Sequence, residues 1–255
     1  EINISITKKT CACFEPSLDY CVIKFPRWDN QKFTNGNNII GSCMKSVGEV
    51  MAIGRTFEEC FLKGLRMMEE KFISFSDEKW KGLLDSELIS LLKNPNDKRI
   101  FIIFEAFLRG YSIEDIFNWT KINKWFLYKF KKLAIIEKKL LEKQFEYTPE
   151  LIVYLKKNGF SDKHIASCLN VEEIVIRNFR TEYKIRPYVK QIDTLAAEFP
   201  AQTNYLYCSY NANEDDLDFN DKGIMVLGCG AYRIGSSVEF DWSAVSCNRT
   251  LKKLG

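Results

Sequence analysis

The chain has 255 residues, of which 46% are hydrophobic and 14% aromatic, so it has enough apolar material for a folded core and is not a disordered polypeptide. Its 37 basic and 34 acidic residues leave a net charge of +3, which gives no reason to expect nucleic acid or an anionic membrane as a partner. The apolar runs are far shorter than the roughly 20 residues of a membrane-spanning helix, and no signal segment opens the chain, so we expect a cytoplasmic protein.

Nine cysteines are scattered through mostly apolar contexts, and we expect reduced thiols within the core. Cys11-x-Cys13 has no second pair of ligands, and the only histidine, His164, is distant in the sequence, so a zinc site is not expected. His164 follows Lys163 on a short predicted helix, where a surface position is expected. It therefore completes no triad with a serine or cysteine nucleophile.

The first 70 residues combine extended and helical patterns. Strands are predicted at residues 18–25 and 49–53. A helix follows up to about residue 72, because Thr56 is a suitable N-cap and Glu59, three residues later, completes a capping box. This arrangement is typical of the edge of an α+β domain.

From residue 76 to 185 every strong hydrophobic period is helical. Helices are predicted at residues 77–92, 97–109, 113–119, 123–144, 149–157, 162–169 and 171–183. Thr148 before Pro149, Gly159 after the same helix and Ser161 before the next are favourable caps. A group of aromatic residues supplies the core of a small helical domain: Phe101, Phe104, Phe107, Trp119, Trp125, Phe126 and Phe130.

The remaining residues are less periodic. Alternating side chains predict a short strand within 203–210, and the acidic run 214–218 is expected to be a solvated loop that joins two domains. The apolar run Ile224 to Leu227 predicts a buried parallel strand, followed by a glycine turn at Gly228 and a helix that ends near residue 254.

The glycine turn does not match the dinucleotide fingerprint, because Arg233 stands where the third glycine of G-x-G-x-x-G belongs. Two interpretations of Arg233 remain open. It could donate to an anion near a helix N-terminus, together with Ser236 and Ser237, or pair structurally with Glu239 or Asp241. Neither indicates NAD.

Glu49 and Arg55 bracket an apolar strand, and Gly48 and Gly54 beside them would allow another backbone to approach closely. Such charges are found at the rim of a site, but the solvated ends of a strand are the preferred interpretation.

Residues 150–183 have the spacing of a helix-turn-helix, with Arg177 and Arg180 on the last helix. Glu172 and Glu173 stand where base contacts would lie, and phosphate repels them, so helical packing is the preferred interpretation. A helix-turn-helix DNA-binding protein is kept as an alternative.

Three separated segments resemble one family. FEPSLDY at 14–20, MKSVGEVMAIGR at 44–55, and IDTLAAEF at 192–199 together with the stretch 228–242 are similar to the large synthetase component of carbamoyl-phosphate synthase. PAQTNYLY at 200–207 and YRIGSSVEFDW at 232–242 resemble the eukaryotic multifunctional, glutamine-dependent form.

This resemblance implies a mixed architecture and an internal fragment. Residues 1–72 would end an α+β ATP-grasp domain, 73–190 would form an all-α oligomerisation domain, 191–221 a linker, and 222–255 the truncated start of an α/β pre-ATP-grasp domain. The full protein would be an ATP-dependent carbon-nitrogen ligase for pyrimidine synthesis, with ATP and Mg²⁺ or Mn²⁺ as cofactors. A non-catalytic scaffold derived from the synthetase is a second alternative.

The resemblance also implies site residues. The family's Glu-x-Asn-Pro-Arg motif is absent, so no catalytic residue and no ligand of ATP or metal is assigned to this segment. Four positions correspond to an intermediate tunnel: Arg233, Gly235, Ser237 and Glu239. Glu49 and Arg55 correspond to the rim of the first-half reaction chamber. Expected partners are the rest of the synthetase, a glutaminase and a second copy through the helical domain, with neither nucleic acid nor membrane.

Overall fold

The computed structural model describes residues 11, 18–29, 32, 38–68, 72–76, 78–193, 200–201, 205–218, 223–228, 230–235 and 238–255, with the backbone only at 78 and 238–240. Of the segments predicted from sequence, parts of 14–20, 192–199 and 200–207 lie outside these residues. No helix within the described ranges has the length and apolar character needed to cross a bilayer.

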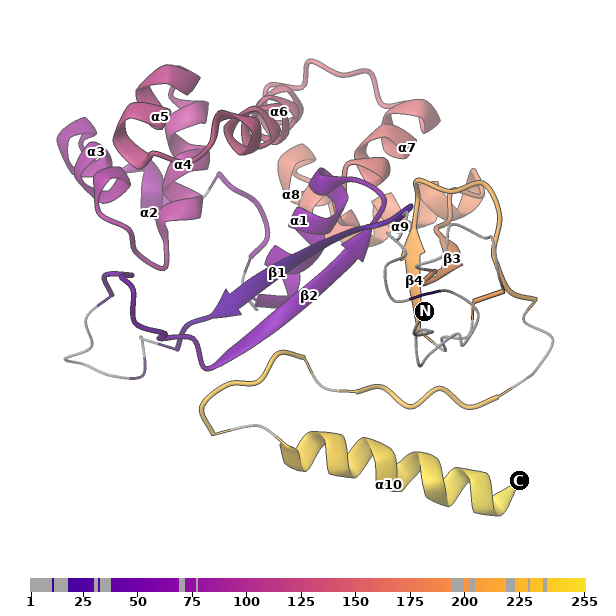
Figure 1. The fold of residues 1–255 in the computed structure, drawn as a ribbon. Coiled ribbons are helices and arrows are strands. Elements are labelled where there is room, and N and C mark those ends of the chain that lie inside the picture. Colours follow the sequence, from indigo (N-terminus) through magenta and orange to yellow (C-terminus); the bar gives the residue numbers. More distant parts are fainter. Residues whose placement is uncertain are drawn as a thin grey trace.

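An antiparallel hairpin lies across the middle of the molecule, as Figure 1 shows. Strand β1 is Cys21–Arg27 and strand β2 is Gly48–Gly54, with Phe25 opposite Val50. Both predicted strands are thus confirmed, the first displaced by a few residues. Helix α1, Phe57–Met68, packs on one face of the hairpin. A Cβ at Gly64 would lie 2.2 Å from the Phe25 ring, so a glycine is needed where the helix meets the strand.

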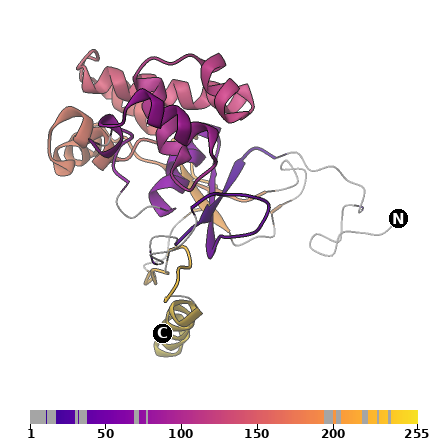
Figure 2. The ribbon, with the colours of Figure 1, turned by 90° about the vertical axis from the view of Figure 1, so that its left-hand side faces the viewer.

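The helices α2 to α9 lie on the same side of the hairpin as α1 and form a further layer there (Figures 1 and 2). They are α2 Glu78–Lys81, α3 Asp85–Lys93, α4 Arg99–Leu108, α5 Ile113–Thr120, α6 Lys124–Leu141, α7 Pro149–Lys157, α8 Asp162–Leu169 and α9 Glu173–Glu182. The helical prediction is confirmed with one exception. The predicted helix 77–92 is two helices, because the chain turns at residues 82–84 and Glu87 accepts the Leu84 N–H at the new N-terminus.

A continuous aromatic core joins α1 to the helical layer. The Phe61 ring lies 5.5 Å from Phe25 of the hairpin, 5.9 Å from Phe104 of α4 and 4.8 Å from Phe130 of α6, between ring centroids. Phe75 stacks on Phe104 at 3.5 Å. Because large aromatic side chains bury 150 to 250 Å² each, roughly, this cluster is the main apolar contribution to the fold.

A second antiparallel pair follows the helices. Strand β4, Leu206–Ser209, lies within the predicted strand 203–210, whereas its partner β3, Tyr188–Gln191, was not predicted. The acidic run 214–218 is a largely exposed loop, as predicted, and two of its carboxylates accept hydrogen bonds from β3. Asp215 accepts the Val189 N–H (2.7 Å) and Asp216 accepts the Gln191 N–H (2.8 Å). These carboxylates satisfy the donors of β3 that a further strand would otherwise pair.

The C-terminal region differs most from the prediction. Residues 223–228 form no strand and their apolar side chains are exposed, so the predicted buried strand 224–227 is wrong. A strand needs a neighbour for its backbone groups, and no described residue pairs with this one. The predicted final helix is α10, Val238–Leu254, which stands apart from the other helices in both ribbon views (Figures 1 and 2). Ser236 and Ser237, which were predicted as possible anion donors, lie outside the described residues.

Candidate functional site

The segment that contains Arg233 lies against the end of the hairpin. The Ile234 N–H donates to Asp29 Oδ2 (2.7 Å). A Cβ at Gly48 would lie 2.4 Å from the Tyr232 carbonyl oxygen, so this approach of two backbones requires glycine. The close approach predicted at Gly48 is therefore confirmed, and it brings together positions almost 200 residues apart in the chain.

Asp29 is the anchor of this contact. It is buried, and it also accepts from Arg27 Nε (3.3 Å) and pairs with Lys32 (3.3 Å). Burial alone would raise its pKa, but the Ile234 N–H and the two cations outweigh burial and lower the pKa. Asp29 therefore stays ionised and holds residues 232–235 on the hairpin.

The predicted tunnel residues are only partly described. Gly235 has φ +84°, a backbone conformation that other residues rarely adopt. Ser237 lies outside the described residues, and Glu239 is described only as a backbone position in α10. The neighbouring Asp241 accepts the Tyr232 hydroxyl. The tunnel assignment accordingly stays a prediction.

The predicted rim residues stand at opposite ends of β2. Glu49 pairs with Lys24 across the hairpin (2.7 Å), where both side chains are exposed. Arg55 pairs with Asp19 (2.6 Å). The structure does not bring Glu49 and Arg55 together, because six residues of extended strand separate them by about 20 Å.

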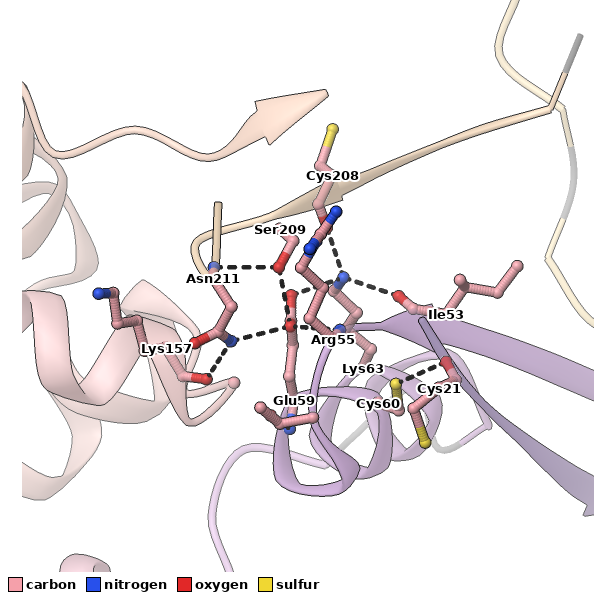
Figure 3. A network of polar contacts seen from close by, with 12 residues as sticks. Cys21, Ile53, Arg55, Glu59, Cys60, Lys63, Lys157, Cys208, Ser209 and Asn211 are labelled. Atoms are coloured by element: carbon pink, nitrogen blue, oxygen red, sulfur yellow. Dashed lines mark hydrogen bonds and ion pairs between the residues drawn. The ribbon is translucent and has the colours of Figure 1, made fainter. Parts of the chain in front are cut away.

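A buried polar junction, centred on Glu59, connects the hairpin, α1, α7 and β4 (Figure 3). Glu59 is 1% exposed. Its Oε2 accepts from the Arg55 N–H (3.0 Å), the Ser209 hydroxyl (2.9 Å) and the Asn211 amide (3.0 Å). Its Oε1 lies 3.0 Å from the Lys63 ammonium one helical turn away. Among the described residues Oε1 accepts no hydrogen bond, so the buried charge is compensated by the three hydrogen bonds at Oε2 and by the Lys63 cation beside Oε1.

Lys63 and Asn211 extend the junction to backbone groups. Lys63 Nζ donates to the Ile53 carbonyl of β2 (2.8 Å) and to the Cys208 carbonyl of β4. Asn211 donates to the Lys157 carbonyl at the end of α7 (2.8 Å). The junction thus ties the segment before the helical layer directly to the segment after it, as the dashed lines of Figure 3 show.

Sequence reasoning identified Glu59 only as half of a capping box. The Thr56 hydroxyl does accept the Glu59 N–H (3.3 Å), but the carboxylate accepts from Arg55 instead of Thr56. The sequence feature that could have indicated the role of Glu59 is Gly54, because a Cβ added at Gly54 would lie 2.8 Å from the Glu59 carboxyl carbon. Gly54 therefore provides the predicted close approach, to a side chain and not to a backbone.

A second buried ion cluster joins α7, α8 and α9. Asp162 accepts from Lys156 (2.8 Å) and from Arg180 Nη2 (2.8 Å), and Arg180 also donates to the Ile185 carbonyl (3.1 Å). Burial would raise the Asp162 pKa, but the hydrogen bonds from Arg180 and Lys156 lower it overall. Because Arg180 is committed to this cluster, it is not presented to phosphate. The helix-turn-helix alternative is therefore not favoured.

The expected surface position of His164 is wrong. His164 is 2% exposed, and its Nε2 lies 2.8 Å from Glu137 Oε2. Glu137 also accepts the backbone N–H groups of Phe75 (3.1 Å) and Ser76 (2.7 Å). The sequence did indicate a buried polar contact, because Glu137 lies on the same face of α6 as Leu133 and Leu140, and a carboxylate on an apolar face needs a buried partner such as His164.

Glu137, His164 and Cys168 are the residues that come nearest to a metal centre within the described part of the chain. They do not fit one. Both Glu137 oxygens already accept backbone hydrogen bonds, and burial raises the pKa of the Cys168 thiol, so a metal ion would have to displace these bonds and deprotonate the thiol. Burial likewise raises the pKa of Cys60, whose thiol donates to the Cys21 carbonyl (3.1 Å).

The described residues do not fit ATP and its metal ions either. A phosphate site at a glycine turn requires converging N–H donors at a helix N-terminus. Gly228 and Gly230 instead lie in exposed coil, several residues before α10 begins at Val238. The buried carboxylates Glu58, Glu59 and Asp162 are all paired with lysine or arginine.

The fold and the junction define a connecting module, in which a helical domain holds together the segments before and after it. The family model for "Carbamoyl-phosphate synthetase large chain, oligomerisation domain" matches residues 49–184, and that for "Carbamoyl phosphate synthase preATP-grasp domain" matches residues 220–255. The chain belongs to the carbamoyl-phosphate synthetase large-chain family.

Relatives match the chain from end to end. Multifunctional protein URA2 of Saccharomyces cerevisiae is 52% identical over 99% of this chain and 11% of its own length. The mitochondrial arginine-specific carbamoyl phosphate synthase large chain of Schizosaccharomyces pombe is 52% identical over 100% of this chain and 22% of its own length. Multifunctional protein CAD of Squalus acanthias is 52% identical over 98% and 11%. The chain thus spans between 11% and 22% of the length of these relatives.

Proposed function

We propose that the chain is an internal segment of a glutamine-dependent carbamoyl-phosphate synthase and that it connects and assembles the two ATP-grasp halves of that enzyme. The observation that carries this proposal is the 52% identity to such synthetases across essentially the whole chain. The domain division is part of the proposal, with the first ATP-grasp half ending near residue 72, the oligomerisation domain at 73–190, a linker to 221 and the pre-ATP-grasp start from 222.

The complete enzyme would make carbamoyl phosphate from bicarbonate, glutamine-derived ammonia and two ATP. ATP and Mg²⁺ or Mn²⁺ would bind outside this segment, because the family's Glu-x-Asn-Pro-Arg motif is absent from it and its buried carboxylates Glu58, Glu59 and Asp162 are paired with lysine or arginine. Relatives named for a multifunctional protein and for arginine-specific synthesis are equally similar. Pyrimidine synthesis in the cytoplasm is the more specific assignment that we propose, from the eukaryotic multifunctional motifs.

The proposed partners are the remainder of the synthetase, a glutaminase domain or subunit, and a second copy through the helical domain. Antibodies against this chain should precipitate a polypeptide several times larger than 29.8 kDa that makes carbamoyl phosphate from bicarbonate, glutamine and ATP. A precipitated protein near 29.8 kDa without that activity would support the scaffold alternative instead.

We further propose that Arg233, Gly235, Ser237 and Glu239 line or approach the tunnel through which carbamate reaches the second site. Enclosure is physically reasonable, because carboxyphosphate and carbamate are short-lived in water. The Asp29 contact supports this proposal, since it holds residues 232–235 on the hairpin of the first half.

Arg233→Ala in the complete enzyme should lower coupled carbamoyl phosphate synthesis more than bicarbonate-dependent ATP hydrolysis at the first site. The two rates are measured on the same preparation, with Lys252→Ala of α10 as a control for loss of a cation. Equal loss of both activities would argue against a role in the tunnel.

A further inference from the structure

The exposed side of α6 carries an apolar stripe. Trp125, Tyr128, Lys132, Ile135 and Lys139 follow one another at spacings of three and four residues, so they lie along one side of the helix. Trp125, which was predicted to lie in the core, is 52% exposed, Tyr128 is 62% exposed and Ile135 43%. At a rise of about 1.5 Å per residue the stripe is about 21 Å long, the length of a four-turn helix.

A groove accompanies the stripe. A cavity of about 480 Å³ lies between α6, the start of α5 and α7. Apolar and aromatic side chains line it together with three lysines of α6. The lining residues are Ile113, Tyr128, Lys131, Lys132, Ile135, Ile136, Lys139, Phe145 and Tyr154. None of them is acidic.

The charge around the groove is unbalanced. Helix α6 carries six lysines, and its single acid, Glu137, is buried and faces His164. Lys132 pairs with Glu58 (2.8 Å), and Lys139 lies 5.9 Å from the centre of the Phe145 ring. Lys131 has no ion pair with a carboxylate among the described residues. The surface therefore combines exposed apolar area with positive charge that the described chain does not neutralise.

We propose that this surface binds an acidic amphipathic helix from the remainder of the same polypeptide. Spacings of three and four residues are those at which two helices pack, and carboxylates beside the apolar face of the partner would complement the lysines. An intramolecular partner is favoured because this chain makes up only 11% to 22% of its relatives' length, so most of the polypeptide lies outside it. The proposal rests on the proposed function, which makes this chain an internal segment.

Zero-length carbodiimide coupling of the full-length protein, followed by peptide mass spectrometry, tests this proposal. Lys131 or Lys139 should couple to an aspartate or glutamate outside residues 1–255, within a segment of helical periodicity. Lys124 and Glu114 serve as the internal control, because their side chains lie 2.6 Å apart on the same surface. Mixing unlabelled and ¹⁵N-labelled protein separates coupling within one molecule from coupling between copies.

Ile135→Asn removes the apolar side chain from the partly exposed stripe without adding a carboxylate that could itself couple to Lys139, and it should reduce the coupling at Lys139 by about tenfold or more, with the control pair unchanged. Coupling between two copies would overturn the proposal in favour of self-association. The proposal would also be overturned if Lys124 couples to Glu114 while neither Lys131 nor Lys139 couples to a carboxylate outside residues 1–255. A natural polypeptide no longer than this chain would instead contradict the proposed function, so the two failures are distinguishable.

Discussion

Glu59 is the residue on which the connection between separate segments depends most. Its carboxylate holds Arg55 of the hairpin end, Lys63 of α1 and the Ser209–Asn211 turn after β4. A buried carboxylate with all its donors in place contributes only modestly to net stability, but removing its charge leaves several donors without an acceptor.

Glu59→Gln should lower the free energy of unfolding by about 2 to 3 kcal/mol. The new amide NH₂ would face groups that are themselves donors, and Lys63 would lose its counter-ion. The matched control is Glu49→Gln on β2, whose pair with Lys24 is exposed and should contribute at most about 1 kcal/mol. Denaturant unfolding of both variants provides the comparison. Equal effects would show that the junction does not stabilise the fold.

The Asp162 cluster makes stability depend on pH in a defined direction. Its folded-state pKa lies below the ordinary value of 3.8, so its contribution is fully present above that value and is lost as pH falls through the folded pKa. The difference in unfolding free energy between the native protein and Asp162→Asn should therefore be constant near neutrality and shrink below about pH 4. A difference that grows on acidification would contradict this assignment.

At the scale of single elements, α1 packs so closely on β1 that helix propensity is overridden. Gly64→Ala would normally stabilise a helix interior by about 1 kcal/mol. Here the new Cβ would lie 2.2 Å from the Phe25 ring, so we expect destabilisation of about 1 to 3 kcal/mol.

Thermal unfolding of Gly64→Ala measures the sign of this effect. Asn178→Ala on the exposed side of α9 is the control, and it should be neutral or slightly stabilising. A rise in melting temperature for Gly64→Ala would mean that the ring moves aside without cost.

Local signals predicted most of the helices and both strands of the hairpin. Pro149 and the caps Thr148 and Ser161 define helix starts at the observed residues, because capping is a local interaction. Strand β3 was missed because its partners, β4 and the carboxylates of Asp215 and Asp216, come from later in the chain. The burial of His164 and the role of Glu59 were missed for the same reason, since both depend on side chains from other elements.

For the molecule as a whole, the Glu59 junction links the segment that precedes the helical layer to the segment that follows it. Hairpin and α1 precede the helical layer, β4 follows it, and Glu59 holds both to the end of α7. The Asp29 contact adds a second link, between the hairpin and residues 232–235. The helical layer is thereby fixed between the two flanking regions, which the proposed function assigns to successive halves of the synthetase.

The measurement that tests this account most directly is the ratio of carbamoyl phosphate synthesis to bicarbonate-dependent ATP hydrolysis in the full-length protein with Glu59→Gln, compared with Glu114→Gln, whose ion pair with Lys124 is exposed. Small misplacements of reacting parts can cost up to about a hundredfold in rate, so we predict that Glu59→Gln lowers the ratio by about tenfold or more while the variant keeps its helical circular dichroism. An unchanged ratio in a folded Glu59→Gln protein would contradict the claim that this segment couples the two halves.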